Sequence, residues 1–420
     1  MEKIIVRGGR KLQGEVDISI AKNSVLPIIV ATILNPTEII LKKVPMLEDV
    51  TVLINLLREL NCEVQFSSIT GDLKINTLNL KEVDPNSELI RKMRASFLVM
   101  GPMLARFGRC KISMPGGCNI GSRPVDLHLK GFKSLGIESE IGYGYVEAKV
   151  DKLHGNRIYL DFPSVGATEN IMMAAILAPG ITVIENAAEE PEIWDLARFL
   201  NSMGAKIEGA GYGKITIHGV SQLKQPEPFT PIFDRIEAGT FMVAAGITNS
   251  KITINGVNEE HLMPTIEKLK ECGVYCSIDG QKMIVDGTQE KKPVDIKTMP
   301  YPGFPTDMQA QIMALLSITR GVSVITETVF ENRFMHVGEL GRMGANIKID
   351  GRIAIVEGVS TLTGCEVKAT DLRAGAAMIL AGLVANGKTE IGEVYHIDRG
   401  YTNIEEKFKK LGAEIYRIHK

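Results

Sequence analysis

Six segments of the chain are rich in small and apolar residues on nearly every side of a helix. A surface helix keeps one polar side, whereas a helix that is apolar all round is buried. The pattern therefore predicts six buried helices, which cover approximately residues 24–34, 95–105, 168–177, 239–247, 308–318 and 374–385. Other segments are amphipathic, such as residues 404–411 (IEEKFKKL), and predict helices that face water.

A second pattern is a helix end followed by glycine or asparagine, the residues that favour positive φ just after a helix. It occurs at Leu60-Asn61, Leu135-Gly136, Met203-Gly204, Cys272-Gly273, Met343-Gly344 and Leu411-Gly412, and the second residues lie 75, 68, 69, 71 and 68 positions apart. Short β-patterned runs follow both kinds of helix, for example residues 251–255 and 282–285. The chain is therefore predicted to be an α/β protein of six copies, each with about two helices and four strands.

The copies are expected to group into two domains of three. The sixth copy has one strand, residues 413–418, before the chain ends, and strand-like residues 4–7 and 14–18 precede the first buried helix. We expect these N-terminal strands to complete the sixth copy. The domains are then residues 22–230 and residues 1–21 plus 231–420, joined near the proline-rich residues 225–231, with a cleft between them that closes. Spacing alone leaves a division into two and four copies open.

Composition and charge disfavour several classes of function. A net charge of −2 argues against a general nucleic-acid or membrane-surface binder, and 5% aromatic residues argue against base-stacking platforms. No signal peptide or membrane-spanning run is visible, and the six cysteines form no CxxC pair, so we expect a cytoplasmic protein with reduced thiols. Walker A, Rossmann and GxSxG motifs and metal-ligand spacings are absent from the sequence, and His336 and His396 are expected to be structural, so no cofactor and no metal is implied.

Polar and charged residues gather directly before the predicted buried helices. They are Lys22-Asn23, Met93-Arg94, Ser164-Val165-Gly166, Asp234-Arg235, Thr306-Asp307 and Asp371-Leu372-Arg373. A helix N-terminus offers unpaired N–H groups and a partial positive charge, so it is a natural anion site. Capping and ion pairing explain any one of these positions, but six of them in register favour a polyanionic substrate.

The glycine-rich segment 114–128 (MPGGCNIGSRPVDLH) carries one thiol, Cys118, with Arg123 five residues later. A thiol close to guanidinium groups and phosphate can exchange protons or act as a nucleophile. A buried, inert cysteine is the alternative, and it is the state that we expect for the other five. Asp126 and His128 flank a predicted helix start, where capping is their default role.

At these positions the chain resembles the enolpyruvyl transferases. The matching stretches are AKNS at 21–24, MRAS at 93–96, PGGCNIGSRPVDLH at 115–128, SVGAT at 164–168, DRIEAG at 234–239, FPTDMQAQ at 304–311, ITETVFENRFMHV at 325–337, ATDLRA at 369–374 and YHIDRGY at 395–401. The cysteine-containing stretch and FPTDMQAQ are the most specific. The resemblance implies two similar domains, each of three βαββαβ units with buried inner helices, an arrangement known as an inside-out α/β barrel.

The resemblance also implies an activity. It is the transfer of the enolpyruvyl group of phosphoenolpyruvate to the 3′-hydroxyl of UDP-N-acetylglucosamine, with release of phosphate, as the first committed step of peptidoglycan precursor synthesis. Both substrates are small molecules, and no nucleic acid, membrane or obligate protein partner is implied. Transfer to a shikimate-pathway acceptor is an alternative, against which the PGGC and RPVDLH runs argue. A non-catalytic anion-binding protein is another, against which the intact set of site residues argues.

The matched motifs imply the site residues. Phosphoenolpyruvate is expected to contact Lys22, Asn23, Arg123, Arg373 and Arg399, with Asp371 as a nearby acid–base candidate. UDP-N-acetylglucosamine is expected to contact Arg94, Arg123, Pro124, Val125, Asp126, Leu127, Ser164, Val165, Gly166, Asp307 and Val329. The expected catalytic residues are Cys118, Asp307, Lys22 and Arg399. Asp307 would accept the proton of the 3′-hydroxyl, and Cys118 would donate a proton and could form a covalent adduct. Phe162 stands where many relatives have a lysine, and this departure affects one diphosphate contact.

Overall fold

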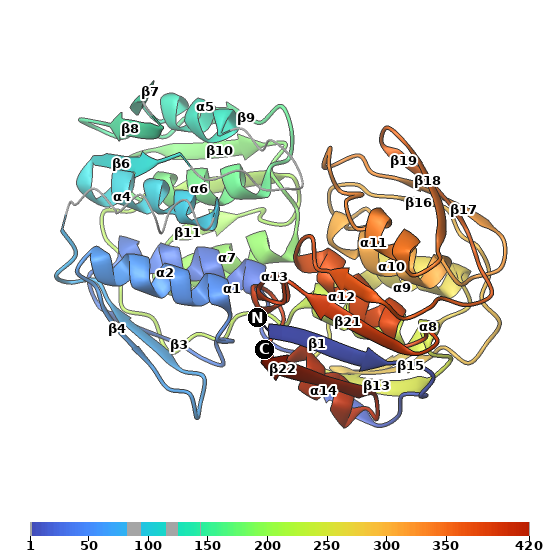
Figure 1. Cartoon of the computed structure of the whole chain (residues 1–420). Coiled ribbons are helices and arrows are strands. Elements are labelled where there is room, and N and C mark those ends of the chain that lie inside the picture. Colours follow the sequence, from blue (N-terminus) through green and yellow to red (C-terminus); the bar gives the residue numbers. More distant parts are fainter. Residues whose placement is uncertain (1, 82–93, 115–124, 143, 420) are drawn as a thin grey trace. The chain divides into compact units, whose positions relative to one another are not determined.

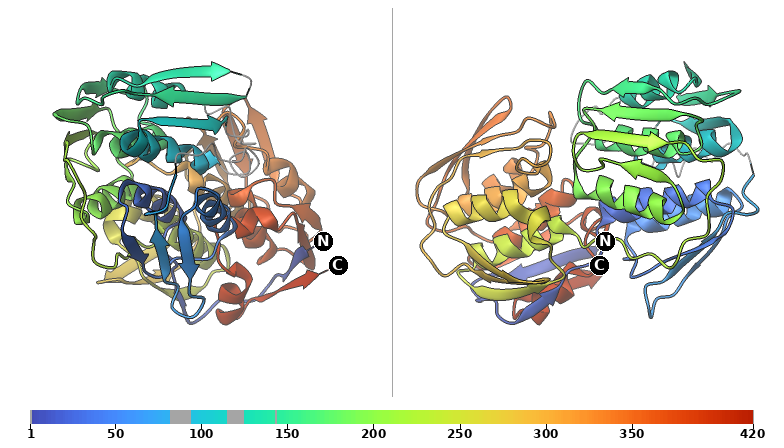
Figure 2. Two further views of the ribbon diagram at one scale, coloured as in Figure 1. Left: turned by 90° about the vertical axis from the view of Figure 1, so that its left-hand side faces the viewer. Right: turned by 180° about the vertical axis from the view of Figure 1, so that it is seen from behind.

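The chain forms two compact units in a computed structural model that describes residues 2–81, 94–114, 125–142 and 144–419, with the backbone alone for residues 94 and 95 (Figure 1). Described residues up to Ser19 and from Phe233 onward form the discontinuous unit, and those between Ile20 and Ile232 form the continuous unit. The units divide the described residues at 19/20 and 232/233, and the domain division at 21/22 and 230/231 stays a prediction. Each unit has three sheets with inner helices packed behind them, which Figure 2 shows from two further sides.

Three inner helices form the centre of the continuous unit. They are α1 (Lys22–Ala31) with the short η1 (Thr32–Leu34), α4 (Met100–Phe107) preceded by η2 (Arg94–Val99), and α6 (Val165–Ala175). Every residue from Ser24 to Ala31 of α1 is buried, and so is every residue from Ala167 to Ala175 of α6. This is the burial that the all-round apolar pattern predicts, since neither helix has a polar side to turn toward water.

Among the described residues, the outer elements of the continuous unit are three helices and three small sheets. The helices are α2 (Glu48–Glu59), α5 (Asp126–Ser134) and α7 (Pro191–Ser202). The first sheet has the order β3 (Glu38–Leu41), β5 (Leu73–Asn76), β4 (Glu63–Phe66), and the second has the order β6 (Arg109–Ser113), β8 (Tyr145–Lys149), β7 (Glu138–Gly142). The third has the order β11 (Lys206–Glu208), β12 (Lys214–His218), β10 (Ile181–Glu185), β9 (Arg157–Tyr159).

The discontinuous unit repeats this plan. Its inner helices are α8 (Arg235–Ile247), α10 (Gln309–Leu316) with η3 (Thr306–Met308) before it, and α12 (Leu372–Gly382). Its outer helices are α9 (Glu259–Glu271), α11 (Val337–Arg342), α13 (Tyr395–Asp398) and α14 (Ile404–Lys410).

Three four-stranded sheets cover these helices. The first has the order β14 (Tyr275–Asp279), β15 (Lys282–Asp286), β13 (Lys251–Asn255), β2 (Glu15–Asp17). The second has the order β16 (Ile296–Lys297), β17 (Val322–Thr326), β19 (Ile353–Glu357), β18 (Asn346–Asp350). The third has the order β20 (Glu366–Lys368), β21 (Lys388–Gly392), β1 (Glu2–Arg7), β22 (Glu414–His419).

Neighbouring α8 and α9 show how the two kinds of helix differ in sequence. In α8 every residue from Ile236 to Ile247 is buried. In α9 only Leu262, Thr265, Ile266 and Leu269 are buried, at the spacing of a single helix face. Each fully buried Leu or Ile side chain contributes about 1.5–3 kcal/mol relative to exposure, so the apolar positions alone decide which helix is inside.

The turn after each outer helix has the predicted backbone conformation. Positive φ values of 62°, 90°, 94°, 91°, 96° and 95° occur at Asn61, Gly136, Gly204, Gly273, Gly344 and Gly412. The six glycine or asparagine positions read from the repeat are therefore confirmed as helix-terminating residues.

The two N-terminal strands go to different copies, which corrects one prediction. β1 lies between β21 and β22 and completes the sixth copy, as expected. β2, however, pairs in parallel with β13 of the fourth copy. In the third copy the strand before the inner helix runs parallel to the strand after it, as β9 does with β10. The segment before α8 cannot supply this strand because its Phe229 bridges Leu41 of β3 in the first copy, so β2 occupies the edge of β13 instead.

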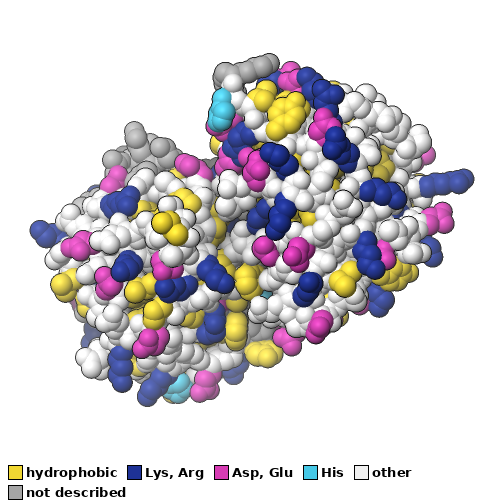
Figure 3. Space-filling model, turned by 90° about the horizontal axis from the view of Figure 1, so that it is seen from below, with side chains coloured by type: hydrophobic (Ala, Val, Ile, Leu, Met, Phe, Trp, Pro, Cys, Tyr) yellow, Lys and Arg dark blue, Asp and Glu magenta, His cyan; other side chains and the backbone are white. Residues whose placement is uncertain are grey.

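The surface carries both signs of charge. In the view of Figure 3, Lys and Arg side chains alternate with Asp and Glu, without a broad area of one sign. This agrees with the net charge of −2. Within the described ranges, no helix combines the length and the apolar character needed to cross a membrane.

Candidate active site

Two inner helices of the discontinuous unit begin at an aspartate that caps them. Asp234 Oδ1 accepts hydrogen bonds of 2.8 and 3.0 Å from the backbone N–H groups two and three residues further on. Asp371 Oδ1 accepts bonds of 2.9 and 3.1 Å from the equivalent groups of α12. Each carboxylate thereby pairs with N–H groups that a helix start leaves without intrahelical partners. Both residues thus have the capping role expected of a single acid at such a position.

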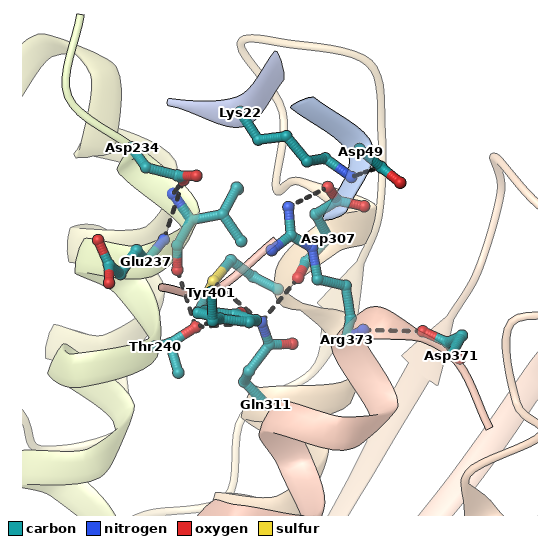
Figure 4. A network of polar contacts seen from close by, with 12 residues as sticks. Lys22, Asp49, Asp234, Glu237, Thr240, Asp307, Gln311, Asp371, Arg373 and Tyr401 are labelled. Carbon is teal, nitrogen blue, oxygen red and sulfur yellow. Dashed lines mark hydrogen bonds and ion pairs between the residues drawn. The ribbon is translucent and has the colours of Figure 1, made fainter. Parts of the chain in front are cut away.

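Asp307, which precedes the remaining inner helix, has different partners (Figure 4). Its Oδ1 accepts a hydrogen bond of 2.8 Å from Arg333 Nη2, and its Oδ2 accepts one of 2.9 Å from Arg373 Nη2. The side chains of both arginines are 3% exposed, whereas that of Asp307 is 27% exposed. One carboxylate therefore holds two nearly buried guanidinium groups and still presents part of its surface to the outside.

Arg373 has N–H donors that are not used by the described residues. Its Nε and Nη1 atoms are buried and have no partner among the described residues. Burial alone would lower the pKa of this guanidinium, but the charge of Asp307, followed by those of Tyr401 and Asp234, raises it above its ordinary value. Buried N–H donors are almost always paired, and a guanidinium binds carboxylate or phosphate through two parallel bonds. The side chain is therefore suited to hold an anion.

A hydroxyl and an amide link the inner helices beneath Asp307. Tyr401 Oη and Thr240 Oγ1 of α8 lie 2.9 Å apart, and Gln311 Nε2 of α10 donates to the backbone oxygen of Asp307 at 2.8 Å. The ring of Tyr401 lies under the Arg373 guanidinium, with 5.4 Å between the guanidinium carbon and the ring centroid. Burial raises the pKa of Tyr401, so the phenol stays protonated and able to donate. These contacts fix the position of Asp307 relative to α8 and α12.

Glu327 fixes the segment on the other side of Asp307. It is 1% exposed and accepts hydrogen bonds from Thr306 Oγ1 at 2.9 Å and from the N–H groups of Val329 and Phe330 at 2.8 and 3.1 Å. Val329, an expected contact of the UDP-sugar, is half-buried. One buried carboxylate thereby joins the residue before Asp307 to the loop that carries Val329.

The charge of Asp371 acts on two histidines, His336 and His396. Burial lowers the pKa of His336 to about 4, although the charge of Asp371 acts in the opposite direction. Burial also lowers the pKa of His396, and the charge of Arg399 adds to that effect. Both rings are therefore neutral at pH 7, as suits structural residues. Arg399 itself is half-buried at the end of α13.

In the continuous unit, Lys22 is the first residue of α1. Its Nζ lies 3.0 Å from Asp49 Oδ2, and the two side chains are 11% and 5% exposed. Asn23 follows it and is half-buried. The ammonium group is thereby held at the start of a helix, whose partial positive charge adds to its own.

The start of α6 has the geometry of an anion site. The Ser164 hydroxyl accepts a hydrogen bond of 3.4 Å from Ala167 N, and Val165 and Gly166 form the half-exposed first turn. At the start of α5, Val125 is buried, Asp126 is exposed and Leu127 is half-buried. His128 is buried, with its Nδ1 3.0 Å from Asn170 Nδ2 of α6, so it joins α5 to α6 rather than capping a helix.

An acidic cluster lies behind the first turn of α6. Glu169 is 4% exposed, and burial, followed by the charges of Glu192 and Glu190, raises its pKa well above the ordinary range. Desolvation and like charges both disfavour the charged form of the Glu169 carboxyl, so it holds its proton more tightly than an ordinary glutamate does.

Several expected residues cannot be placed. Cys118, Arg123 and Pro124 lie outside the described residues, and Arg94 is described by its backbone alone. The five described cysteines, which are Cys62, Cys110, Cys272, Cys276 and Cys365, form no disulfide. Across the described ranges, no three His, Cys, Asp or Glu side chains gather in a way that could hold a metal ion.

Two residues of the site were not anticipated. Arg333 and Glu327 both lie in the stretch ITETVFENRFMHV, which we matched to a family without giving these positions a role. The only signal in the sequence was that these two residues are charged, and charged residues are rarely buried without a partner.

Comparisons with known proteins identify close relatives. The sequence profile of the family described as EPSP synthase (3-phosphoshikimate 1-carboxyvinyltransferase) matches residues 6–408. The chain is 65% identical to UDP-N-acetylglucosamine 1-carboxyvinyltransferase 2 of Clostridium tetani and 63% identical to UDP-N-acetylglucosamine 1-carboxyvinyltransferase 1 of Clostridium acetobutylicum, with 100% of each chain covered in both cases.

Solved structures share the fold. The enolpyruvyl transferase NikO from Streptomyces tendae superposes with a TM-score of 0.89 at 23% identity, over 99% of this chain and 98% of that one. EPSP synthase from Acinetobacter baumannii superposes with a TM-score of 0.75 at 19% identity over the whole of both chains. The expected fold of two domains built from βαββαβ units with inner helices is thereby confirmed.

Proposed function

We propose that this chain, which belongs to the EPSP synthase family of enolpyruvyl transferases, transfers the enolpyruvyl group of phosphoenolpyruvate to the 3′-hydroxyl of UDP-N-acetylglucosamine and releases phosphate. Relatives that are 65% and 63% identical over their full length are UDP-N-acetylglucosamine 1-carboxyvinyltransferases. The acceptor is therefore a UDP-sugar rather than a shikimate derivative, in agreement with the PGGC and RPVDLH runs of the sequence.

The pairing of Asp307 with Arg333 and Arg373 carries this proposal. It combines a carboxylate whose side chain is 27% exposed with a buried guanidinium whose Nε and Nη1 atoms have no partner among the described residues and can bind an anion. A proton acceptor next to an anion-binding cation is what the addition of a hydroxyl group to phosphoenolpyruvate requires. Each carboxylate oxygen has a second lone pair, so Asp307 can accept a proton while it keeps both hydrogen bonds from the arginines.

The reaction follows in two steps. The 3′-oxygen forms a bond to C2 of phosphoenolpyruvate, Asp307 takes the hydroxyl proton, and an acid, assigned to Cys118, protonates C3. The resulting tetrahedral intermediate then loses a proton from C3, the bond from C2 to the phosphate oxygen breaks, and phosphate leaves.

Cations stabilise the charges of both substrates. Arg373 and Arg399, together with Lys22, Asn23 and Arg123, are assigned to the phosphate and carboxylate of phosphoenolpyruvate. Positive charge fixed in place before the reaction stabilises the negative charge that develops on the departing phosphate.

The UDP-sugar is assigned to the residues expected for it from the sequence, two of which, Arg123 and Asp307, also have the roles given above. These residues are Arg94, Arg123, Pro124, Val125, Asp126, Leu127, Ser164, Val165, Gly166, Asp307 and Val329. The half-exposed first turn of α6 supports a diphosphate contact, because the N-terminus of a helix is a natural site for an anion. Phe162 is 44% exposed and supplies no positive charge, so the diphosphate is held without the lysine of many relatives.

Phosphate release tests the proposal. The chain should release phosphate from phosphoenolpyruvate when UDP-N-acetylglucosamine is present and not when shikimate 3-phosphate replaces it. Release with shikimate 3-phosphate alone would assign the other acceptor, and release with neither would indicate a non-catalytic anion-binding protein. The cytoplasmic location and the lack of an obligate protein partner stay predictions.

A further inference from the structure

Arg399 directly follows α13, a helix that is too short to be stable without support from the residues around it. α13 has only four residues, whereas a stable helix in water needs many more, because the first turn is costly to form. The direction of the Arg399 side chain therefore depends on how the residues next to it are packed. This dependence concerns the proposed function, in which Arg399 binds phosphoenolpyruvate.

Close packing fixes the segment on both sides of Arg399. A methyl group added at Gly375 of α12 would lie 2.4 Å from Ile397 Cγ1, and one added at Gly400 would lie 2.6 Å from Leu372 Cδ2. Real carbon atoms do not approach so closely, so both glycines are in direct contact with their neighbours. The backbone on either side of Arg399 thus rests on the first turns of α12, the helix that begins with Asp371 and carries Arg373.

The residue between these contacts, Asp398, is held by a two-pronged ion pair. Arg417 of β22 donates from Nη1 to Asp398 Oδ2 at 2.8 Å and from Nη2 to Asp398 Oδ1 at 2.7 Å. The same guanidinium donates from Nε and Nη2 to Glu405 at 2.7 and 3.3 Å, and from Nη1 to Glu2 at 2.9 Å. All five N–H groups of Arg417 are therefore engaged.

These five bonds make the guanidinium a rigid anchor. The Arg417 side chain is 20% exposed and that of Glu405 8%, whereas Asp398 and Glu2 are 32% and 44% exposed, so the guanidinium lies largely out of water but two of its partners do not. The bonds to Asp398 foremost, with those to Glu405, raise the pKa of Arg417, so the anchor stays charged at every pH at which the protein is folded. The anchor also joins the two ends of the chain, because Glu2 lies in β1 and Arg417 in β22.

We propose that Arg417 is a positioning residue for the reaction: by gripping both oxygens of Asp398 it fixes the backbone of the next residue and so directs Arg399 toward phosphoenolpyruvate. Arg417 does not touch the substrate in this scheme. It acts through the peptide bond between Asp398 and Arg399, with the two glycine contacts preventing the segment from rotating away.

The test is Arg417→Lys. A lysine keeps the positive charge but replaces the planar fork by a single ammonium group, which cannot hold two carboxylate oxygens in parallel. We expect the KM for phosphoenolpyruvate to rise about tenfold while the KM for UDP-N-acetylglucosamine stays within about twofold, because only one substrate depends on Arg399. A tenfold change is what the loss of one good charged contact produces.

Two further variants make the test specific. Asp398→Asn leaves Arg417 bound to Glu405 and Glu2, so the fold is retained while one bond to Asp398 is weakened. This variant should also raise the KM for phosphoenolpyruvate. The double variant Asp398→Asn with Arg417→Lys should raise that KM no further than Arg417→Lys alone does. The control is Arg157→Lys, which disrupts another two-pronged ion pair, in the other unit: Arg157 of β9 donates to Glu185 of β10 with two bonds of 2.8 Å, from a side chain that is 74% exposed. It should change neither KM.

The outcomes separate the two proposals. No phosphate release by the wild-type chain with both substrates would refute the proposed function. Wild-type release with an unchanged KM for phosphoenolpyruvate in Arg417→Lys and Asp398→Asn would refute the role of Arg417 alone. Equal losses for both substrates, together with a lower melting temperature, would show that Arg417 supports only the fold.

Discussion

Replacement of Asp307 by asparagine tests the proposed chemistry most directly. The amide has nearly the same shape as the carboxylate and keeps one oxygen that can accept from Arg333 or Arg373. It cannot accept a proton from the sugar hydroxyl. The variant therefore separates the role of Asp307 as a base from its role as a partner of two arginines.

The structure sets the size of both effects. A well-placed general base contributes about 10²- to 10⁴-fold in rate, or about 3–5 kcal/mol of activation free energy. Removal of one partner of a fully buried ion pair costs about 3–5 kcal/mol, but Asp307 is 27% exposed and its amide keeps one hydrogen bond. A loss of about 1–3 kcal/mol in the free energy of unfolding is then expected, the cost of a buried donor without a partner.

Three measurements check this prediction. Phosphate release should show kcat lowered by 10²- to 10⁴-fold, calorimetry should show an almost unchanged affinity for UDP-N-acetylglucosamine, and denaturant unfolding should show the moderate loss of stability. A kcat close to that of the wild type would refute the assignment of Asp307 as the base. A loss of stability without any change in kcat would leave it a purely structural residue.

Three other predictions concern thiols, a buried acid and the shape of the chain. Iodoacetamide at pH 8 should label Cys118 first. Burial raises the pKa of the thiols of Cys62 and Cys276 to about 12 and that of Cys272 to about 11, it also raises the pKa of the half-buried Cys365, and Cys110 is buried. Rapid labelling elsewhere, located by peptide mass mapping, would oppose the role of Cys118. Glu169→Gln should stabilise the fold at pH 8 but not at pH 4, because the pKa of Glu169 is raised above the ordinary 4.5 in the folded protein, and the wild type therefore loses stability as the pH rises. The exposed Glu208→Gln is the control. An equal effect of Glu169→Gln at both pH values in denaturant unfolding would contradict the reasoning. Saturating UDP-N-acetylglucosamine should make the protein more compact in X-ray scattering, and an unchanged radius of gyration would contradict the expected closure.

Local patterns were sufficient to predict the elements of the fold. The burial of α8 and the single buried face of α9 both follow from side chains within a few residues of one another. The positive φ at Gly273 and Gly344 depends on a residue type and a helix end, which are also local. The order of helices and turns could therefore be predicted without knowledge of any long-range contact.

Long-range pairing could not be predicted in the same way. β2 has the alternation of a strand, but the choice of β13 as its partner depends on the segment before α8, which lies more than 200 residues away and is engaged elsewhere. The roles of Arg333 and Arg417 likewise arise only when distant segments meet. Their sequence neighbourhoods contain charged residues that a surface position would explain equally well.

The three equivalent aspartates of the discontinuous unit show how a repeated structure comes to hold one reactive group. Asp234 and Asp371 lie directly before inner helices, and both are used as caps. Asp307 holds the corresponding place in the fifth copy, but η3 and α10 begin without a side-chain cap, and the Asp307 carboxylate turns to Arg333 and Arg373. A missing cap costs a helix about 1 kcal/mol, and two buried arginines need a counter-charge that the other copies do not supply. The copy that gives up its cap is therefore the one whose carboxylate remains available to accept a proton, which is why we assign the base to Asp307 rather than to the two acids that share its position in the repeat.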